Sequence, residues 1–489
     1  RSDYRARMGA RTGDEYINGL KDDRTVWLDG RRVDVVGEPR FAGSLRGMAE
    51  YFDYQHDHAD DCLVVDLDSD ELINASHIIP RSDDDLARRH RALDRLARYS
   101  IGMLGRTPDY VNVTVAGFAA QRSLFEKNGD TRAGAALAAF QREVALGDLS
   151  LTHTIINPVI DKAVGDIEGI NAELLPRIVR RTEDGIVVSG SKILGTLGPF
   201  ADENFVYPAH PLPKGADPDY ALCFSVPVGA KGLHTVCRDH YAVDGTRGDH
   251  PFSSRFDEQD AFLIFDEVEV PWERVFIAGD LDVYGSLMKH GWGANVIQQT
   301  AIRAAVKLEF AYDLAFKMVE VQNMGARSEA TQLLGELVTY ADMTRAAIRA
   351  AEAGAHEYRY GGWFCDTEPF AALRALMPSW MSRVNDIFKT LGSHNLLCTP
   401  NEAAFADPEL GPLVRRYLPG ANGISAEERA RVFRMAWDFA GSALGSRSEL
   451  YERFYLASQP RNLSGNHMMA QLGREWTDVD DFRHVSGIE

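Results

Sequence analysis

Apolar residues recur at steps of four along the C-terminal part of the chain. One such stripe consists of Ile302, Val306, Phe310, Leu314 and Met318. Similar spacing predicts further helices over residues 328–353, 378–391 and 425–456, the last opened by Ser425 and Glu428 in a capping-box arrangement. Because long helices with one apolar stripe bury it by packing together, the pattern predicts a C-terminal helical bundle.

The middle of the chain, residues 151–280, changes to short β-branched runs separated by turn residues. These runs predict strands over 177–181, 185–194, 220–228 and 261–270. The first two strands are joined around Asp184-Gly185, a pair typical of tight turns. The stretch 208–218 is rich in Pro and Gly and predicts a loop.

The N-terminal part is mainly helical in pattern. Thr12 and Glu15 form a capping-box signature, and residues 82–99 place acids first and arginines last, as the helix dipole favours. Between them, the Asp29-Gly30 turn predicts a small two-stranded ribbon. Helices, then strands, then a bundle predict an α+β protein with three domains: 1–150, 151–280 and 281–489.

Composition narrows the class of protein. The 489 residues carry a formal net charge of −19, with 45% apolar and 26% charged residues, which are values near globular averages. An acidic chain without a basic face repels phosphate backbones, so no nucleic-acid partner is expected. The 5 cysteines are never spaced CxxC, which favours reduced thiols in a cytoplasm. No apolar run reaches the length of about 18 residues that a membrane span needs, so no membrane association is expected.

Several common catalytic signatures are absent from the sequence: GxGxxG, the P-loop motif, GxSxG and HExxH. Their absence removes the main support for Rossmann, P-loop and α/β-hydrolase functions. His56 and His58 stand in an acidic run that superficially resembles a metal cluster. A solvated acidic helix end explains such a run more simply, so no metal site is expected.

Residues 105–110 predict the start of a helix. Thr107 suits the N-cap, Pro108 the first helical position and Asp109 the first turn. Arg106 then lies at the helix mouth and Tyr110 about one turn inside, so a cation and a phenol can converge on a small anionic ligand. An arginine bonded to loop carbonyls and a tyrosine packed in the core would have the same spacing, and both interpretations stay open.

His153 and Thr196 are two further candidates. His153 interrupts a strand-like run over 151–158 and is either a satisfied core residue or a hydrogen-bonding or proton-transfer group. Thr196 lies between two glycines just after a predicted strand end at Leu194. A plain turn explains this position, and so does a planar cofactor that approaches the backbone and bonds the threonine hydroxyl.

At these residues the chain resembles the oxygenase components of two-component, reduced-flavin-dependent aromatic hydroxylases, the 4-hydroxyphenylacetate 3-monooxygenase family. The resemblance covers nearly the whole chain. It rests on these stretches in order: 12–16, 27–33, 105–110, 153–161, 253–258, 270–273 and 448–452. Several matches of this kind in the same order are more specific than any single motif above.

The resemblance implies an acyl-CoA dehydrogenase-like fold with a helical N-terminal domain, a β-barrel-like middle domain and a C-terminal helical bundle, assembled as a homotetramer. It implies that three side chains contact a phenolic hydroxyl: Arg106, Tyr110 and His153. It also implies that Thr196 bonds the isoalloxazine of FAD. Further residues would border the flavin: His153, Thr154, Ile155, Val159, Ile160, Asp161, Lys162, Ser458, Gln459, Pro460 and Arg461. The family commonly has an arginine where Lys162 stands, and residues 458–461 match it poorly.

The implied reaction starts from reduced FAD delivered by a separate NAD(P)H:flavin reductase, since no second dinucleotide-binding module is found in the chain. O2 adds to the flavin, and the flavin hydroperoxide transfers OH to the carbon ortho to the phenolic oxygen, which gives a catechol. Arg106 and His153 would favour phenolate character in the substrate. The para substituent stays open: a free phenolic acid, a halophenol, or a tyrosine derivative tethered to a carrier protein.

Three other classes of protein are kept as alternatives. An iron–sulfur dehydratase of the 4-hydroxybutyryl-CoA type would need cluster-ligating cysteines, and no CxxxC spacing exists. An acyl-CoA dehydrogenase-like flavoenzyme would need a carboxylate base that the sequence does not place. A non-catalytic helical scaffold would not need the four residues Arg106, Tyr110, His153 and Thr196 together.

Overall fold

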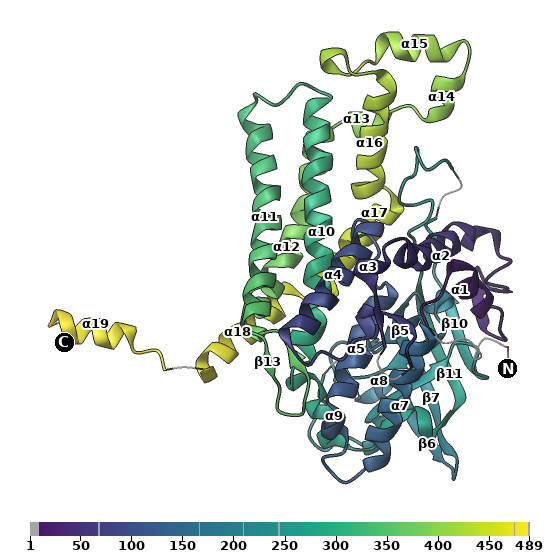
Figure 1. The fold of residues 1–489 in the computed structure, drawn as a ribbon, viewed down its shortest axis with the longest axis vertical. Coiled ribbons are helices and arrows are strands. Elements are labelled where there is room, and N and C mark those ends of the chain that lie inside the picture. The colour runs from purple at the N-terminus through teal and green to yellow at the C-terminus, as the bar shows by residue number, and fades with distance from the viewer. Residues whose placement is uncertain are drawn as a thin grey trace.

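Helices at both ends of the chain enclose two β-sheets in the computed structural model (Figure 1). The structure describes residues 9–66, 69–165, 167–208, 210–242, 245–473 and 475–487. The prediction of an α+β protein that ends in a helical bundle is confirmed.

The N-terminal helices are α1 (Gly13–Gly19), α2 (Ala42–Asp57), α3 (Ala59–Cys62), α4 (Asp83–Tyr99), α5 (Pro108–Ala120), α6 (Arg122–Phe125) and α7 (Thr131–Gly147). The predicted capping box at α1 is confirmed, because Thr12 and Glu15 each accept the other's backbone N–H. Ser82 caps α4 in the same way, by accepting the backbone N–H of Asp85.

The larger sheet has the strand order β2-β1-β10-β11-β7-β6. Its strands are β1 (Thr25–Leu28), β2 (Arg31–Val33), β6 (Arg177–Arg181), β7 (Gly185–Thr196), β10 (Leu233–Cys237) and β11 (Asp260–Pro271). The predicted ribbon turns at Asp29 and Gly30, which both have the positive φ, 51° and 72°, that a two-residue hairpin turn requires. The ribbon is not a separate unit, since β1 pairs in parallel with β10 of the middle section.

The smaller sheet has the order β12-β9-β8-β5. Its strands are β5 (Leu151–Thr154), β8 (Glu203–Val206), β9 (Leu222–Pro227) and β12 (Val275–Ala278). Two-stranded ribbons are formed by β3 (Leu63–Val65) with β4 (Leu72–Asn74) and by β13 (His356–Glu357) with β14 (Trp363–Phe364), and two short helices are α8 (Gly169–Leu174) and α9 (Leu281–Ser286). The four predicted strands are confirmed, whereas β8, β10 and β12 were missed because runs of four or five residues are too short to show a period.

The bundle is built on α10 (Trp292–Glu320), α11 (Ser328–Ala353) and α12 (Thr367–Gly392) (Figure 1). The remaining C-terminal helices are α13 (Asn395–Cys398), α14 (Glu402–Ala406), α15 (Leu410–Tyr417), α16 (Ala426–Ala440), α17 (Ala443–Phe454), α18 (Gln459–Gly473) and α19 (Asp478–Ser486). The single helix predicted over 425–456 is wrong, because Ser442 accepts the backbone N–H of Gly445 and starts a new helix there.

The predicted helix start at Pro378 is also wrong, because α12 begins earlier and Pro378 lies inside it. A proline lacks the N–H that would bond the carbonyl four residues earlier, and that carbonyl belongs to Arg374. Asn462 of α18 donates its side-chain N–H to this carbonyl at 3.0 Å. The proline therefore creates the acceptor on which the next helix docks.

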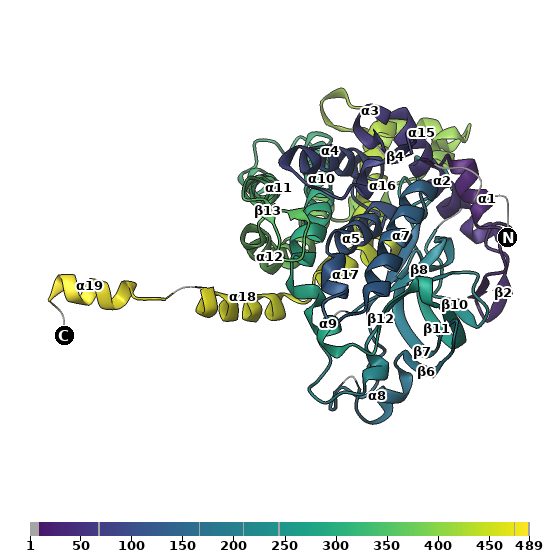
Figure 2. The same ribbon diagram turned by 60° about the horizontal axis from the view of Figure 1, so that its bottom comes forward.

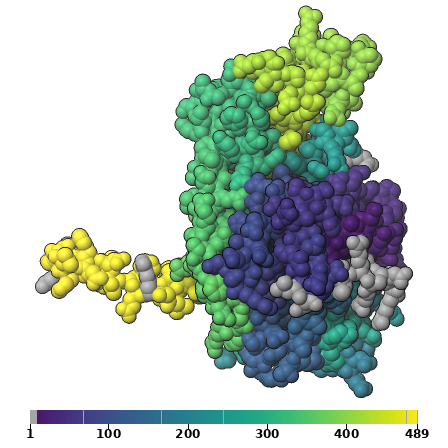
Figure 3. Space-filling model, in the orientation of Figure 1, coloured from purple at the N-terminus to yellow at the C-terminus, as the bar shows by residue number. Residues whose placement is uncertain are grey.

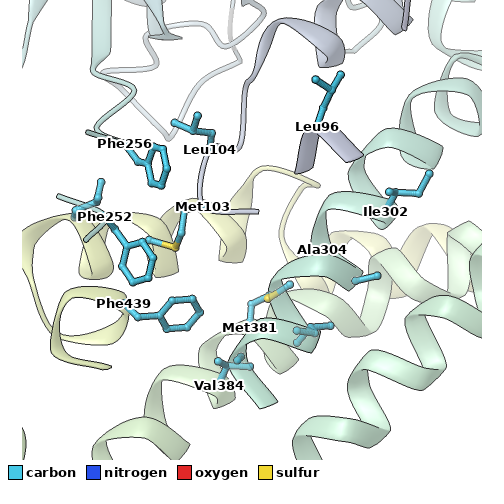
Figure 4. Packing of buried hydrophobic residues seen from close by; sticks show 14 of the residues in the cluster. Leu96, Met103, Leu104, Phe252, Phe256, Ile302, Ala304, Met381, Val384 and Phe439 are labelled. Carbon is cyan, nitrogen blue, oxygen red and sulfur yellow. The ribbon is translucent and has the colours of Figure 1, made fainter. Parts of the chain in front are cut away.

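The main apolar core joins the two ends of the chain. Figure 4 shows Leu96 of α4, Met103 and Leu104, Phe252 and Phe256, Ile302 of α10, Met381 of α12 and Phe439 of α16 around one interior. A second core lies between α5, α7 and the smaller sheet, and a third lies between the sheets. Because the first core crosses the expected boundaries at 150 and 280, the three-domain division stays a prediction.

The last two helices leave the body. Figures 1 and 2 show α18 and α19 extending sideways from the bundle, and Figure 3 shows the arm standing clear of the molecular surface. α19 has no buried residue, and its apolar side chains are exposed: Val479, Phe482 and Val485. None of the helices in the described ranges combines the length and apolar character that a bilayer crossing requires.

Candidate active site

Arg106 lies immediately before α5, which starts at Pro108 as predicted, although Thr107 makes no side-chain cap bond. The residue is only 5% exposed. Its Nε donates to Nε2 of His153 at 2.7 Å, and its Cζ lies 3.9 Å from the ring centroid of Tyr110. The structure thus brings together the three side chains predicted to meet a phenol.

His153 is held between a cation and a phenol. It lies on β5, where β8 is the parallel neighbour, and its Nδ1 is 2.7 Å from the hydroxyl of Tyr207, which follows β8. A guanidinium N–H can only donate, so Nε2 of His153 accepts and Nδ1 carries the proton that Tyr207 accepts. Burial, followed by the charge of Arg106, lowers the pKa of His153 well below its ordinary value. His153 is therefore a neutral imidazole that orients Arg106.

The guanidinium of Arg106 keeps unused capacity. Its Nη1 is buried without a hydrogen-bond partner, and no carboxylate is recorded beside its side chain within the described residues. Aromatic rings surround it instead: the centroids of Tyr455 and Tyr451 lie 5.0 and 5.3 Å from Cζ. A buried cation with a free donor and aromatic walls can hold one small anion, such as a phenolate.

Thr196 ends β7 instead of lying in a loop. The predicted strand end at Leu194 is wrong because the ladder to β11 continues until Asp260 pairs with Thr196. The hydroxyl of Thr196 donates to Oδ1 of Asp260 at 2.8 Å. Leu194, two residues before Thr196, and Leu197, directly after it, have φ of 72° and 67°, a left-handed conformation that costs a branched side chain free energy.

Ion pairs surround the carboxylate of Asp260. Arg447 of α17 donates from Nε at 2.8 Å, and Arg238 donates from Nη2 at 2.9 Å. Arg447 also reaches Glu258 from Nη1 at 2.7 Å, and the other carboxylate oxygen of Glu258 accepts the backbone N–H of Arg106. One arginine thus links the strand that carries Thr196 to the segment that carries Arg106.

The residues expected to border the flavin follow β5. Thr154 bonds the side chain of Asn204, and the backbone N–H groups of Ile160 and Asp161 both donate to Oδ1 of Asn171. Ile155 is half-buried, Val159 is half-buried, and Lys162 is exposed. Ile160 is 68% exposed, which is unusual for a large apolar side chain and fits a surface that a ligand covers.

The segment 458–461 opens α18 beside α12. Gln459 donates to the carbonyl of Ala375, and the backbone carbonyl of Ser458 accepts from Asn462, while Pro460 is exposed. Arg461 places Nη2 3.2 Å from Nδ1 of His210. This contact joins α18 to the Pro-rich loop 208–218, of which residues 208 and 210–218 are described.

A cavity of about 720 Å³ adjoins the ion pair between Asp260 and Arg447. It opens between the larger sheet and α17, and its walls include Ile193, Leu194, Val236, Arg238, Asp260 and Arg447. Ile193 and Leu194 are each 44% exposed, so β7 offers an apolar wall beside the Thr196–Asp260 pair. The lining combines these apolar side chains with the charged groups of Arg238, Asp260 and Arg447, and such a mixed wall suits a planar, partly polar ring system.

Four residues that hold the predicted site residues in place were missed from the sequence: Tyr207, Glu258, Asp260 and Arg447. Glu258 lies in the matched stretch 253–258, and Arg447 directly precedes the matched stretch 448–452, so the family resemblance pointed to both segments. Tyr207 gave no signal, because only the parallel pairing of β5 with β8 brings it to His153.

The acidic run near His56 does not form a metal-ligating group. His56 lies 2.9 Å from the carbonyl of Arg11, and the ring of His58 packs on Tyr54. Over the part of the chain that the structure describes, no group of three or more His, Cys, Asp or Glu side chains could hold a metal ion. The cysteines are all free thiols.

The fold and the site define a class: an α+β protein with a cavity between a sheet and a helix, linked through Arg447 and Glu258 to a buried cation that has unused donor capacity. Two family models match the chain, "4-hydroxyphenylacetate 3-hydroxylase N terminal" over residues 12–277 and "4-hydroxyphenylacetate 3-hydroxylase C terminal" over residues 288–484. The chain belongs to this family, which confirms the resemblance.

Several curated relatives are similar to this chain over most of their length. The 4-hydroxyphenylacetate 3-monooxygenase oxygenase component of Thermus thermophilus is 34% identical, over 92% of this chain and 93% of that protein. The oxygenase component of a Rhodococcus 4-nitrophenol 2-monooxygenase is 32% identical, over 91% and 85%. A Streptomyces globisporus monooxygenase that acts on a peptidyl-carrier-bound 3-amino-3-(3-chloro-4-hydroxyphenyl)propanoyl group is also 32% identical, over 93% and 85%.

Solved structures show the same fold. The crystal structure of a 4-hydroxyphenylacetate 3-monooxygenase oxygenase component complexed with FAD superposes with a TM-score of 0.90 at 32% identity, covering 98% of both chains. An archaeal 4-hydroxybutyryl-CoA dehydratase superposes at 0.87 with 20% identity over 98% of this chain and 95% of that chain, and this likeness concerns the fold alone. The acyl-CoA dehydrogenase-like fold implied by the resemblance is confirmed.

Proposed function

We propose that this protein is the oxygenase component of a two-component monooxygenase, which hydroxylates a para-substituted phenol ortho to its hydroxyl group and yields a catechol. The observation that carries the proposal is the buried guanidinium of Arg106, whose Nη1 has no hydrogen-bond partner and which pairs with no carboxylate in the part of the chain that the structure describes. Such a cation favours a bound phenolate over a bound phenol. A phenolate is the form whose ortho carbon is richest in electrons and most readily accepts oxygen.

The three side chains at the phenol end have different tasks. Arg106 supplies the charge, His153 fixes the guanidinium through the 2.7 Å bond to Nε, and Tyr110 packs its ring against the guanidinium plane. Because His153 is neutral, it accepts the N–H of Arg106 without placing a second positive charge beside the guanidinium. A phenolate oxygen bonded to Arg106 would then have its negative charge stabilised where water is excluded.

The residues present also fit FAD. Ile193 and Leu194 of β7 line the cavity beside Asp260, the partner of Thr196. By the family resemblance, Thr196 would bond the isoalloxazine there, with residues 153–155, 159–162 and 458–461 along its edges. Reduced FAD, supplied by a separate NAD(P)H:flavin reductase, activates O2 when it is bound. The chain's own contribution is to orient the ring system beside Arg106 and to keep water out.

The substituent para to the hydroxyl group is left open among three kinds: a free acid, a small substituent such as nitro or halogen, and a carrier-tethered amino-acid derivative. The names of the relatives cover a free acid, a nitrophenol and a carrier-bound group. The loop 208–218 would border this end of the substrate, since Tyr207 contacts His153 on one side and His210 contacts Arg461 on the other.

The assembly and location remain proposals as well. We propose a homotetramer, and the exposed apolar side chains of α19 support burial against another copy. The free cysteines support a reducing compartment such as the cytoplasm.

The test combines the protein with a flavin reductase, NADH, FAD and ¹⁸O2, and offers it 4-hydroxyphenylacetate, 4-nitrophenol, 4-chlorophenol and a carrier-tethered tyrosine. We expect a catechol that carries one ¹⁸O atom from at least one phenol, identified by mass spectrometry. The matched O-methyl ethers are the control and should not react, because they cannot form a phenolate. Release of hydrogen peroxide alone with every phenol would contradict the proposal.

A further inference from the structure

The hydroxyl of Thr196 can act towards a ligand only as a hydrogen-bond acceptor. Its single hydroxyl hydrogen is directed to Oδ1 of Asp260 at 2.8 Å. An ionised carboxylate has no hydrogen to give, so the threonine is the donor in this pair. The lone pairs of Thr196 Oγ1 are all that remains for a third group, which must itself be a donor.

The ionised state of Asp260 is enforced by its neighbours. Arg447 contacts both carboxylate oxygens, and Arg238 contacts one of them from two nitrogens. Burial by itself raises the pKa of a carboxyl group, but the charges and hydrogen bonds of these arginines outweigh it and hold the pKa of Asp260 below its ordinary value. Thr196 therefore has a permanent acceptor for its proton.

The two redox forms of a flavin differ at the ring nitrogen N5. In reduced flavin N5 carries a hydrogen and is a donor, whereas in oxidised flavin N5 has only a lone pair and is an acceptor. Resting on the proposed function, in which Thr196 bonds the isoalloxazine, we propose that Asp260 is a positioning residue that turns the Thr196 hydroxyl into an obligate acceptor and makes the site select reduced FAD over oxidised FAD.

This selection suits an oxygenase that receives its cofactor from a separate reductase. Two acceptors that face each other repel and leave a buried pair unsatisfied, so oxidised FAD loses a contact that reduced FAD makes. The protein would then release the spent cofactor and bind the fresh one without any change of fold. Arg447 serves the same end, because it holds Asp260 and, through Glu258, the segment of Arg106.

The test measures the dissociation constants of oxidised FAD and, anaerobically, of reduced FAD by equilibrium fluorescence and ultrafiltration, and takes their ratio. In the parent protein reduced FAD should bind more tightly. In Asp260→Asn, the amide can donate to Thr196 and free its hydroxyl hydrogen for oxidised N5. The ratio should therefore fall by about five- to tenfold, the worth of one hydrogen bond. A merely structural role would weaken both forms alike and leave the ratio unchanged.

Four further variants sharpen the result, three single and one double. Asp257→Asn removes the same charge beside Arg238 without touching Thr196, and its ratio should stay within about twofold of the parent value. Thr196→Ser keeps the hydroxyl and should keep the ratio, while Thr196→Val should lower it. In the Thr196→Val background, Asp260→Asn should have no further effect on the ratio, since the two residues act through one bond.

The outcomes separate the two proposals. If the parent binds neither form of FAD, the proposed function fails and this inference falls with it. Two results would overturn only the inference, provided that the parent binds reduced FAD. One is that Asp260→Asn leaves the ratio unchanged; the other is that Asp260→Asn changes the ratio by the same factor in the parent and in the Thr196→Val background. Should Asp260→Asn fail to fold, an unchanged ratio in Thr196→Val overturns it on its own.

Discussion

Arg106 and Arg447 are two buried arginines of one site with opposite surroundings. Arg106 is 5% exposed, bonds a neutral imidazole and three aromatic rings, and has a free Nη1. The Arg447 side chain is 8% exposed and ends on two carboxylates, Glu258 and Asp260. Burial is therefore not what distinguishes them; the presence of counter-charges is.

The difference in surroundings separates an arginine that can bind a ligand from an arginine that holds parts of the structure together. A buried cation whose charge is balanced by carboxylates holds segments together, whereas a buried cation without a counter-ion is an open position for an anion. In a chain with a net charge of −19, carboxylates are abundant, yet among the residues that the structure describes none pairs with the guanidinium of Arg106, and Glu258 accepts only its backbone N–H. The unpaired charge of Arg106 is where we propose that the substrate binds, whereas the paired charge of Arg447 holds together the segments that carry Thr196 and Arg106.

The largest effect on stability should come from breaking the ion pairs of Arg447. Arg447→Gln leaves the buried carboxylates of Asp260 and Glu258 without their shared partner and should lower the free energy of unfolding by about 3–5 kcal/mol. Urea unfolding at fixed protein concentration measures it. Arg453→Gln is the control: it breaks an ion pair whose arginine side chain is 48% exposed and should cost about 0–1 kcal/mol. Equal costs for the two variants would contradict the distinction.

Removing the unpaired charge of Arg106 should slow the reaction. Arg106→Gln removes the charge that favours phenolate, and kcat/KM for the phenol should fall by about 100- to 1,000-fold. Catechol formation measures it, with reduced-FAD binding as a check that the cofactor end is intact. Arg106→Lys should lose less, because it keeps the charge but not the planar guanidinium. A fall of less than about threefold in Arg106→Gln would refute the role of Arg106.

A pH series sharpens the interpretation of His153 as neutral. Its pKa in the folded protein is well below the ordinary value, so near pH 6 the unfolded chain binds a proton that the folded one does not. Stability should therefore fall as the pH drops from 7.5 to 5.5, by up to about 1.4 kcal/mol per pH unit from this one group.

His153→Asn should remove that part of the slope, whatever its effect on stability at pH 7.5. Urea midpoints at several pH values measure it. His467→Asn, at an exposed position, is the control. An identical slope in the parent and His153→Asn would show that His153 takes up a proton in the folded protein.

The smallest effect concerns the support of His153. Tyr207→Phe removes the acceptor of the Nδ1 proton at 2.7 Å and should reduce kcat/KM by about five- to tenfold. Tyr358→Phe is the matched control, because its hydroxyl bonds the backbone carbonyl of Cys365 and contacts none of the predicted site residues, and it should change kcat/KM by less than about twofold. If both variants behave alike, Tyr207 does not position the histidine.

Local structure was largely predictable. The helix start at Pro108, the capping box at Thr12 and the Asp29-Gly30 turn each depend on a few neighbouring residues, and all three were found as expected. Errors arose where distant segments intervene. Pro378 looked like a helix start, yet Asn462 satisfies the carbonyl it frees, and Thr196 looked like a loop residue, yet Asp260 extends its strand.

The site shows the same division. The sequence by itself determined that Arg106 and Tyr110 share a helix start, because a turn of helix sets their spacing. Only the tertiary structure decided that the guanidinium of Arg106 has no counter-ion among the described residues and that Arg447 has two. Charges separated by about 190 residues meet only when α17 packs against β11 and the segment before it. Residue types and local spacing set what each side chain can do; long-range packing sets what each one faces.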